Sequence, residues 1–187
     1  MQSRPSFYRE VHKGIRSFLL DLQVKAGQTE WTDANALGAF RSEAAAAFEL
    51  LTFHAHHEDK YIAPLLQKAS PEVAKILGGS HEDQEETLDE LRAQLAAVDS
   101  LAAGHQFSLA LSRFVGESLV HMADEEEIAM TAIWNAFDDA TILEAHGRLV
   151  SSIPPETMTA FMRWMIPALN PTERTALQNA LKEKQHA

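Results

Sequence analysis

Hydrophobic residues recur every three to four positions along most of this chain, which is the spacing of one face of an α-helix. Alternating runs of β-branched residues, the pattern typical of strands, do not occur. We therefore predict an all-α protein. The predicted helices span residues 5–25, 35–68, 71–98 and 104–137, with a cap at Thr32 or Asp33 and a break at Gly78-Gly79. Short connections between them favour an up-down four-helix bundle in which neighbours run antiparallel.

The chain after the fourth helix is interrupted by prolines, and each interruption predicts a new helix. Two prolines at 154–155 precede one helix, and Asn170-Pro171 precedes another with the pattern of a capping box. We therefore divide the chain into a bundle of residues 1–140 and a C-terminal helical extension of residues 141–187. Large apolar residues in the extension predict that it packs on the bundle or forms a contact in an oligomer.

Composition excludes several classes of protein. The chain has no cysteine, which excludes disulfides, thiolate metal sites and cysteine nucleophiles. The formal net charge of −11 argues against binding to nucleic acid or to anionic membranes. No apolar run approaches the length of a membrane span, and residues 1–10 lack the apolar core of a signal peptide. We therefore expect a cytoplasmic protein.

The pattern His-x-x-x-Glu occurs three times in the chain, although chance alone predicts about one. Residues four apart lie on the same face of a helix, so each pair can direct an imidazole and a carboxylate at one point. Imidazole and carboxylate together are ligands for iron, manganese or zinc. The three pairs are His54/Glu58, His81/Glu85 and His121/Glu125.

His12 and the three pairs all fall on helix faces that the hydrophobic pattern predicts to be buried. A buried carboxylate is costly unless it is paired or bound to a cation, which favours a metal site at the centre of the bundle. The alternatives are a core histidine for His12 and solvated helix faces for the pairs. His57 and Glu126 are alternate ligands. His57 lies about 60° from the direction of His54, and Glu126 stands five residues after His121, although helix geometry favours Glu125.

These residues, with the segment 61–66 that follows Glu58, resemble the bacterial hemerythrin-like (HHE cation-binding) proteins over about residues 5–138. The resemblance implies a four-helix bundle around a non-haem centre of two iron ions with an oxo or hydroxo bridge. It also implies ligand roles. His12 and His54 would bind one iron, His81 and His121 the other, and Glu58 and Glu125 would bridge the two.

The chain departs from the oxygen-carrying members of that family in two places. Those members have His-x-x-x-His on the third helix, where this chain has Glu85, and His-x-x-x-x-Asp on the fourth, where Glu125 stands one position earlier. As an anionic ligand, Glu85 would favour the ferric state and disfavour reversible oxygen binding. If Glu85 instead faces solvent, one coordination position stays open for water or a small ligand.

We therefore expect a di-iron protein that binds or senses oxygen, nitric oxide, peroxide or iron itself rather than one that simply carries oxygen. We do not expect an enzyme, and any activity would be redox chemistry at the metal. Zinc, manganese or nickel suit the same ligands and can replace iron in a purified sample. The alternative is a regulatory module with a structural metal, whose C-terminal helix pair binds a partner or forms a homodimer.

Overall fold

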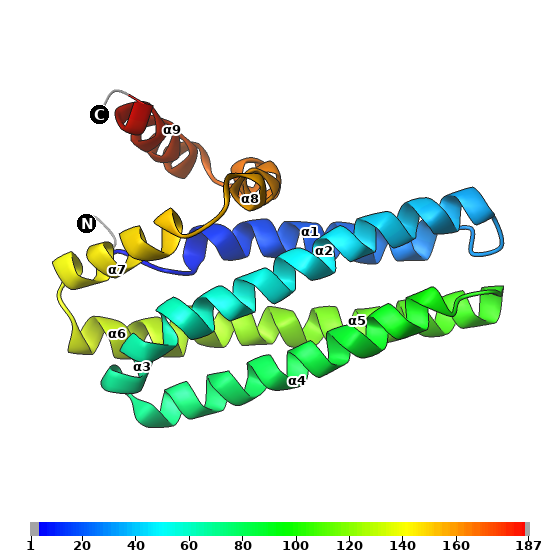
Figure 1. The fold of residues 1–187 in the computed structure, drawn as a ribbon, viewed down its shortest axis with the longest axis horizontal. Helices are drawn as coiled ribbons and strands as arrows, with labels where there is room; N and C mark the ends of the chain where they lie inside the picture. Colours follow the sequence, from blue (N-terminus) through cyan, green and yellow to red (C-terminus); the bar gives the residue numbers. More distant parts are fainter. Residues whose placement is uncertain (1–3, 186–187) are drawn as a thin grey trace.

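The computed structural model describes residues 4–185, and within that range the chain forms helices and no strands (Figure 1). The predicted all-α class is confirmed. The helices are α1 (Arg9–Gln28), α2 (Ala34–Tyr61), α3 (Ala63–Ala69), α4 (Pro71–Ala96), α5 (Leu101–Asp124), a π-helical turn η1 (Glu125–Ala129), α6 (Met130–Ala136), α7 (Asp139–Ser151), α8 (Pro155–Ala168) and α9 (Pro171–Gln185).

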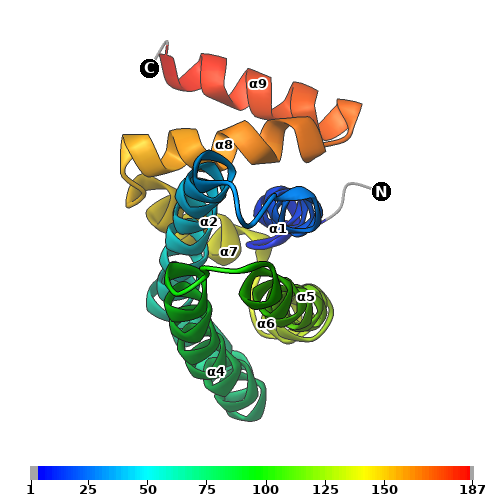
Figure 2. The same cartoon turned by 90° about the vertical axis from the view of Figure 1, so that its right-hand side faces the viewer.

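The helices α1, α2, α4 and α5 form an up-down four-helix bundle. Seen end-on, they occupy four corners, with α1 beside α2 and α5, and α4 completing the square against α2 and α5 (Figure 2). Successive helices run in opposite directions along the long axis (Figure 1). The connections at residues 29–33 and 97–100 are short, which forces the chain to return beside the helix it has left. The predicted bundle is therefore confirmed.

Capping residues and prolines determine where these helices begin and end. Asp33, one of the two candidates, caps α2 by accepting a hydrogen bond from the Ala36 amide at 2.7 Å. The predicted helix over 35–68 is two helices in the structure, because α2 ends at Tyr61 and α3 begins two residues later. Pro64 lies in the first turn of α3, where its missing amide hydrogen leaves no bond unmade.

The break expected at Gly78-Gly79 does not occur, and α4 runs unbroken through both glycines. Glycine keeps its amide hydrogen, so the ladder of backbone hydrogen bonds continues through it. The next residue, Ser80, also bonds back to the Ile76 carbonyl at 3.2 Å, within the helix. Two glycines weaken a helix, but packing of α4 against its neighbours outweighs this small loss.

The fourth long helix contains a π-helical turn directly after α5. In this turn the Met130 amide donates to the Glu125 carbonyl five residues earlier. The extra residue rotates α6 relative to α5, so Met130 and Ile133 are fully buried. Ile128 stands three residues after Glu125, so a continuous α-helix would place the two side chains on the same face. In the structure Ile128 is instead 49% exposed, because the wider turn rotates it outward.

The C-terminal helices pack on the bundle and contribute to its core. Ile142 of α7 is fully buried, and Phe161 of α8 is buried against the bundle. Helix α8 crosses α1 and α2 (Figures 1 and 2). Its backbone approaches so closely that a β-carbon at Gly14 would lie 3.0 Å from Met165. Phe161 is thus a core residue and not part of an exposed surface for a partner.

Helix α9 begins with the predicted capping box, since Glu173 donates its amide to the Asn170 side chain and accepts the Asn170 amide, both at 3.0 Å. Glu173 also binds Lys13 of α1 at 2.6 Å, which ties α9 to the bundle. None of the helices in residues 4–185 combines the length and the apolar character that crossing a membrane requires.

The bundle core is divided into two apolar clusters with a polar layer between them. On α1 the sequence passes from Tyr8 in one cluster, through His12, to Ile15 in the other. The other three long helices of the bundle also pass from one cluster to the other, between Leu51 and Ile62, between Leu88 and Leu77, and between Met122 and Ala129. At the polar layer the buried polar residues are His12, Glu58, His81, Ser118 and Glu125.

Candidate metal centre

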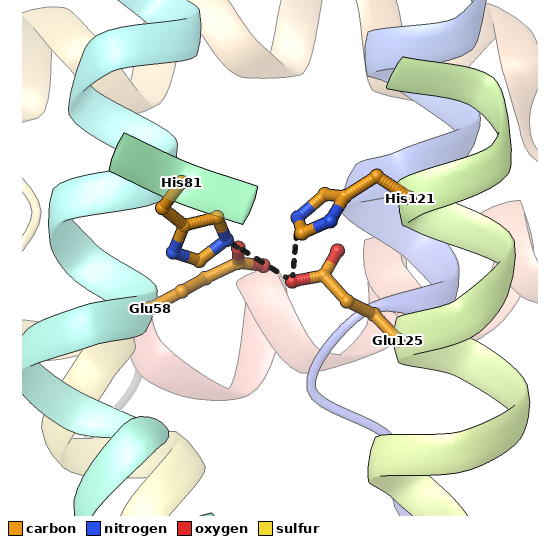
Figure 3. A group of neighbouring side chains, drawn as sticks. All are labelled: Glu58, His81, His121 and Glu125. Carbon is orange, nitrogen blue, oxygen red and sulfur yellow. Dashed lines mark ion pairs between the residues drawn. The ribbon is translucent and has the colours of Figure 1, made fainter. Parts of the chain in front are cut away.

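Six of the seven predicted ligands converge in this polar layer. They come from all four long helices of the bundle: His12 from α1, His54 and Glu58 from α2, His81 from α4, His121 from α5 and Glu125 from η1. Figure 3 shows four of them pointing toward one another from α2, α4, α5 and η1. Two groups have donor atoms close enough to hold a cation, and Glu58 belongs to both: Glu58, His81, His121 and Glu125, and His12, His54 and Glu58.

The two oxygens of Glu58 face different histidines. Oε1 lies 3.1 Å from His54 Nε2 and 3.6 Å from His12 Nε2. Oε2 lies 3.4 Å from His81 Nε2, on the other side of the carboxylate. One carboxylate of α2 therefore contacts imidazoles from α1, α2 and α4.

Glu125 divides its oxygens in the same way. Oε2 lies 3.4 Å from His12 Nε2, while Oε1 lies 3.4 Å from His81 Nε2 and 3.3 Å from His121 Nε2. The dashed lines in Figure 3 mark the contacts of His81 and His121 with these carboxylates. The six side chains thus form two adjacent groups of donor atoms that share Glu58, and Glu125 Oε2 also contacts His12 of the smaller group.

The atoms that face these positions lack ordinary hydrogen bonds. Within the described part of the chain, Nε2 of all four histidines and one oxygen of each glutamate are buried without a hydrogen-bond partner. Leaving each such group unpaired costs about 1–3 kcal/mol. A cation with donors at about 2.1 Å brings neighbouring donors to about 3.0–3.4 Å of each other. The observed spacings lie in this range except for the 3.6 Å between Glu58 Oε1 and His12 Nε2, so the residues fit a cation-binding centre.

Two further carboxylates hold the outer nitrogens of two of the imidazoles. Asp59 Oδ1 lies 2.7 Å from His81 Nδ1, and Glu126 Oε1 lies 3.1 Å from His12 Nδ1. Arg16 binds the same Glu126 oxygen at 2.7 Å. A carboxylate at Nδ1 favours the tautomer with hydrogen on that atom, which turns the lone pair of Nε2 toward the centre. Glu126, an alternate ligand by sequence, thus orients His12 instead.

Without a cation, the buried carboxylates change the pKa values of the histidines. Burial alone would lower the pKa of His12, but Glu126, Glu58 and Glu125 raise it to about 9. Burial also opposes the charged form of His81, whose pKa Glu125 and Glu58 nevertheless raise to about 11. His54 has no comparable set of partners, and burial lowers its pKa to about 4.

Tyr8 closes the centre on the side of α7. Its ring stacks on the His12 ring at a centroid distance of 5.2 Å. Burial raises the pKa of the Tyr8 hydroxyl well above its usual value, and the charges of Glu125 and Glu58 add to this effect. The sequence contained a signal for this contact, because Tyr8 stands four residues before His12 and the two rings therefore share a helix face.

Comparison with protein families decides the identity of this bundle. Residues 5–133 match the family model of the hemerythrin HHE cation-binding domain, and this match covers more than half of the chain. The chain belongs to the hemerythrin family. Searches of curated proteins and of solved structures returned no significant match. The His and Glu cluster is therefore the candidate cation site of a hemerythrin HHE domain.

Glu85 is the one predicted ligand of this hemerythrin domain that lies outside the cluster. Its side chain is 54% exposed, and its Oε1 lies 3.5 Å from His56 Nε2 on the surface. The inward positions of α4 follow the sequence Leu77, His81, Gln84 and Leu88, with alternating steps of four and three. Because residue 84 continues this stripe, residue 85 is rotated about 100° away from it. The expectation that Glu85 joins the centre was therefore wrong in its geometry.

The other alternate ligand, His57, also lies away from the hemerythrin centre. Its ring stacks on Phe53 at 3.9 Å, and its Nε2 lies 3.2 Å from the Ser152 hydroxyl. His57 therefore helps to connect α2 to the end of α7. Burial lowers its pKa, which favours the neutral ring at this contact.

A cavity of about 20 Å³ lies beside the hemerythrin cluster. Gln84 and Ser118 border it, together with both glutamates and three of the imidazoles, those of His54, His81 and His121. A space of about 10–15 Å³ is enough for one water molecule. The cavity therefore has room for one small molecule next to the candidate metal positions. Gln84 was missed by sequence reasoning, although it stands three residues after His81 on the same helix face.

Proposed function

We propose that this hemerythrin-family chain is a non-haem di-iron protein whose centre binds a small ligand. The observation that supports two cations is the division of both carboxylates, each with one oxygen toward His12 and the other toward His81. A single cation would leave half of these donor atoms unused. Two carboxylates that bridge two hard cations use all of them.

With Glu125 Oε2 counted beside His12, each position would have four protein donors, which leaves coordination positions open on iron because iron favours six ligands. The oxygen-carrying members of the family have a further histidine on the third helix. This chain has no such histidine facing the cluster from the described residues of α4, since Gln84 lies there and Glu85 faces solvent. Both positions would therefore have the same protein donors, and both would be open to an added ligand.

The small cavity supports a ligand of the size of oxygen, nitric oxide or peroxide, rather than an organic substrate. Iron bound at this centre would supply one-electron redox chemistry and affinity for such molecules. The protein residues would bind the metal, exclude bulk water and present Gln84 to the ligand. This supports sensing, protection or iron storage.

Glu85 no longer counts against oxygen carriage as an anionic ligand, because its side chain lies on the surface.

Metal analysis after anaerobic iron loading tests the proposal. We expect about two iron ions per chain and a near-ultraviolet absorption band after exposure to oxygen. Substitution of Glu58 by Ala should lower the iron content to one ion or none. The matched control is Glu85→Ala, which removes the same side chain from the surface and should keep both ions. Fewer than about one iron per loaded wild-type chain would refute the proposal.

A further inference from the structure

A second cavity, of about 50 Å³, lies between α2 and α4 on the outer side of the cluster. It shares four bordering residues with the inner cavity, namely Leu51, Ala55, His81 and Gln84. The two cavities are therefore neighbours, separated by side chains that belong to both. Together the two cavities extend from the surface between α2 and α4 toward the His and Glu cluster, with only these shared side chains between them.

The outer end of this cavity is bordered by acidic side chains. Asp59 is 48% exposed, Glu85 is 54% exposed, and Glu82 is also on the surface. Arg92 approaches the other end through Thr52, but Asp89 binds its guanidinium at 2.6 Å. The negative charge that remains attracts cations and repels anions.

The path also carries atoms that bind metal. His56 and Glu85 place an imidazole and a carboxylate 3.5 Å apart at the surface. Asp59 stands between this pair and the interior, bound to Nδ1 of His81. His81 is only 8% exposed and borders both cavities, while its Nε2 has no hydrogen-bond partner among the described residues. Donor atoms thus continue from the surface to the centre.

Packed side chains cover two other sides of the centre. His12 has no exposed surface, and Tyr8 stacks against it. On the side of His54, the buried ring of Phe161 lies at a centroid distance of 6.5 Å and belongs to α8. The extension therefore covers α1 and α2, whereas the face between α2 and α4 keeps its cavity.

We propose that the cavity between α2 and α4 is the entrance by which a divalent cation reaches the centre, and that Glu82, Glu85 and Asp59 hold the cation first. The proposal rests on the proposed function, because it requires a metal centre to be filled. It assigns Glu85 a role in the rate of metal uptake and none in the final coordination.

Stopped-flow uptake of Fe²⁺ under anaerobic conditions tests the entrance, with metal-free full-length protein as the starting material. The double variant Glu82→Gln/Glu85→Gln should take up Fe²⁺ about tenfold more slowly at low ionic strength. The difference should shrink at high salt, since salt screens exposed charges. The matched control is Glu117→Gln/Glu127→Gln, which removes two exposed charges from α5 and η1 and should load like wild type.

A steric variant tests the same path without changing charge. Ala55 borders both cavities, so Ala55→Leu should slow uptake at every salt concentration. Equal rates in the acidic double variant and its control, with full iron content in both, would refute the entrance alone. A lower final iron content in the double variant would also refute it, because Glu85 would then be a ligand. Failure of wild type to bind Fe²⁺ would refute the proposed function instead.

Discussion

Metal binding by this chain should release protons, and the electrostatics of the centre determine how many. The buried carboxylates of Glu58 and Glu125 favour protonated imidazoles when no cation is present. A metal ion binds only the neutral imidazole through Nε2. Each histidine that is charged in the metal-free protein must therefore lose a proton when the centre is filled.

The magnitude comes from three pKa values. At pH 7, His12 with a pKa of about 9 and His81 with a pKa of about 11 are both almost fully protonated. His54, with a pKa of about 4, is already neutral and releases nothing. Filling the centre at pH 7 should thus release about two protons per chain from His12 and His81. At pH 10 the number should fall to about one, because His12 is then mostly neutral.

Titration calorimetry with Co²⁺ at pH 7 in buffers of different ionisation enthalpy measures this release, and anaerobic Fe²⁺ with a pH-indicator dye gives an independent value. The His12→Gln variant should lose about one of the two protons, even if its affinity is reduced. Glu85→Gln is the control, since its exposed side chain contacts none of the imidazoles at the centre. Release of fewer than one proton at pH 7 by wild type would refute the electrostatic reasoning.

Three further predictions concern stability and metal affinity. His12 and His81 have folded pKa values above the ordinary 6.5, so the stability that they contribute to the metal-free protein is complete below about pH 6.5 and is lost as the pH rises through about 9 and then about 11. The Tm of the metal-free protein should therefore fall between pH 7 and pH 10, and a Tm that rises over this range would contradict the raised pKa values of the two histidines. Asp59→Asn should weaken metal affinity about 10–100-fold in a chelator competition by loosening His81, while Asp83→Asn on exposed α4 surface should not. Phe161→Ala should destabilise the fold by about 3–5 kcal/mol in urea, against less than about 1 kcal/mol for the partly exposed Ile166→Ala, and equal losses would show that α8 does not complete the core.

Helix spacing made most of the centre predictable from the sequence. On α2, Leu51, Glu58 and Ile62 lie on one stripe, and the pattern places the carboxylate between two apolar residues. A buried acid on such a stripe needs a partner, and the sequence contains matching histidines on the neighbouring helices. This periodicity predicts the fold class and seven inward side chains, of which six converge in the structure.

The position of Glu85 shows that a spacing of four residues is not sufficient to predict that two side chains both face the centre of the bundle. A helix turns 100° per residue, so inward positions alternate between steps of three and four. On α4 the step after His81 is three, to Gln84, whereas on α5 the step after His121 is four, to Glu125. The apolar neighbours Leu77 and Leu88 contain this information, and a stripe drawn through them passes residue 84.

The π-helical turn was not predictable in this way, because its cause lies in tertiary packing. Glu125 must face the centre, while Met130 must face the neighbouring apolar cluster that contains Ile62 and Ile133. Both side chains are buried. A continuous α-helix would place residues five apart about 140° from each other. The wider turn reduces that angle, so the chain satisfies both contacts at the expense of exposing Ile128.

Two pairs of adjacent acidic residues, Glu58-Asp59 and Glu125-Glu126, contact imidazoles in the same way. On α2, Glu58 faces Nε2 of His81 at 3.4 Å while the next residue, Asp59, binds Nδ1 of the same ring. On η1, Glu125 faces Nε2 of His12 at 3.4 Å while the next residue, Glu126, binds Nδ1. In each case an imidazole from a neighbouring helix is held at both nitrogens by one acidic dipeptide. The first carboxylate stays buried and joins the candidate metal positions, and the second reaches the partly exposed edge of the ring. Asp59 and Glu126 therefore fix the orientation of the two histidines that both buried carboxylates contact, although the sequence indicated Glu126 as an alternate ligand and gave no such role to Asp59.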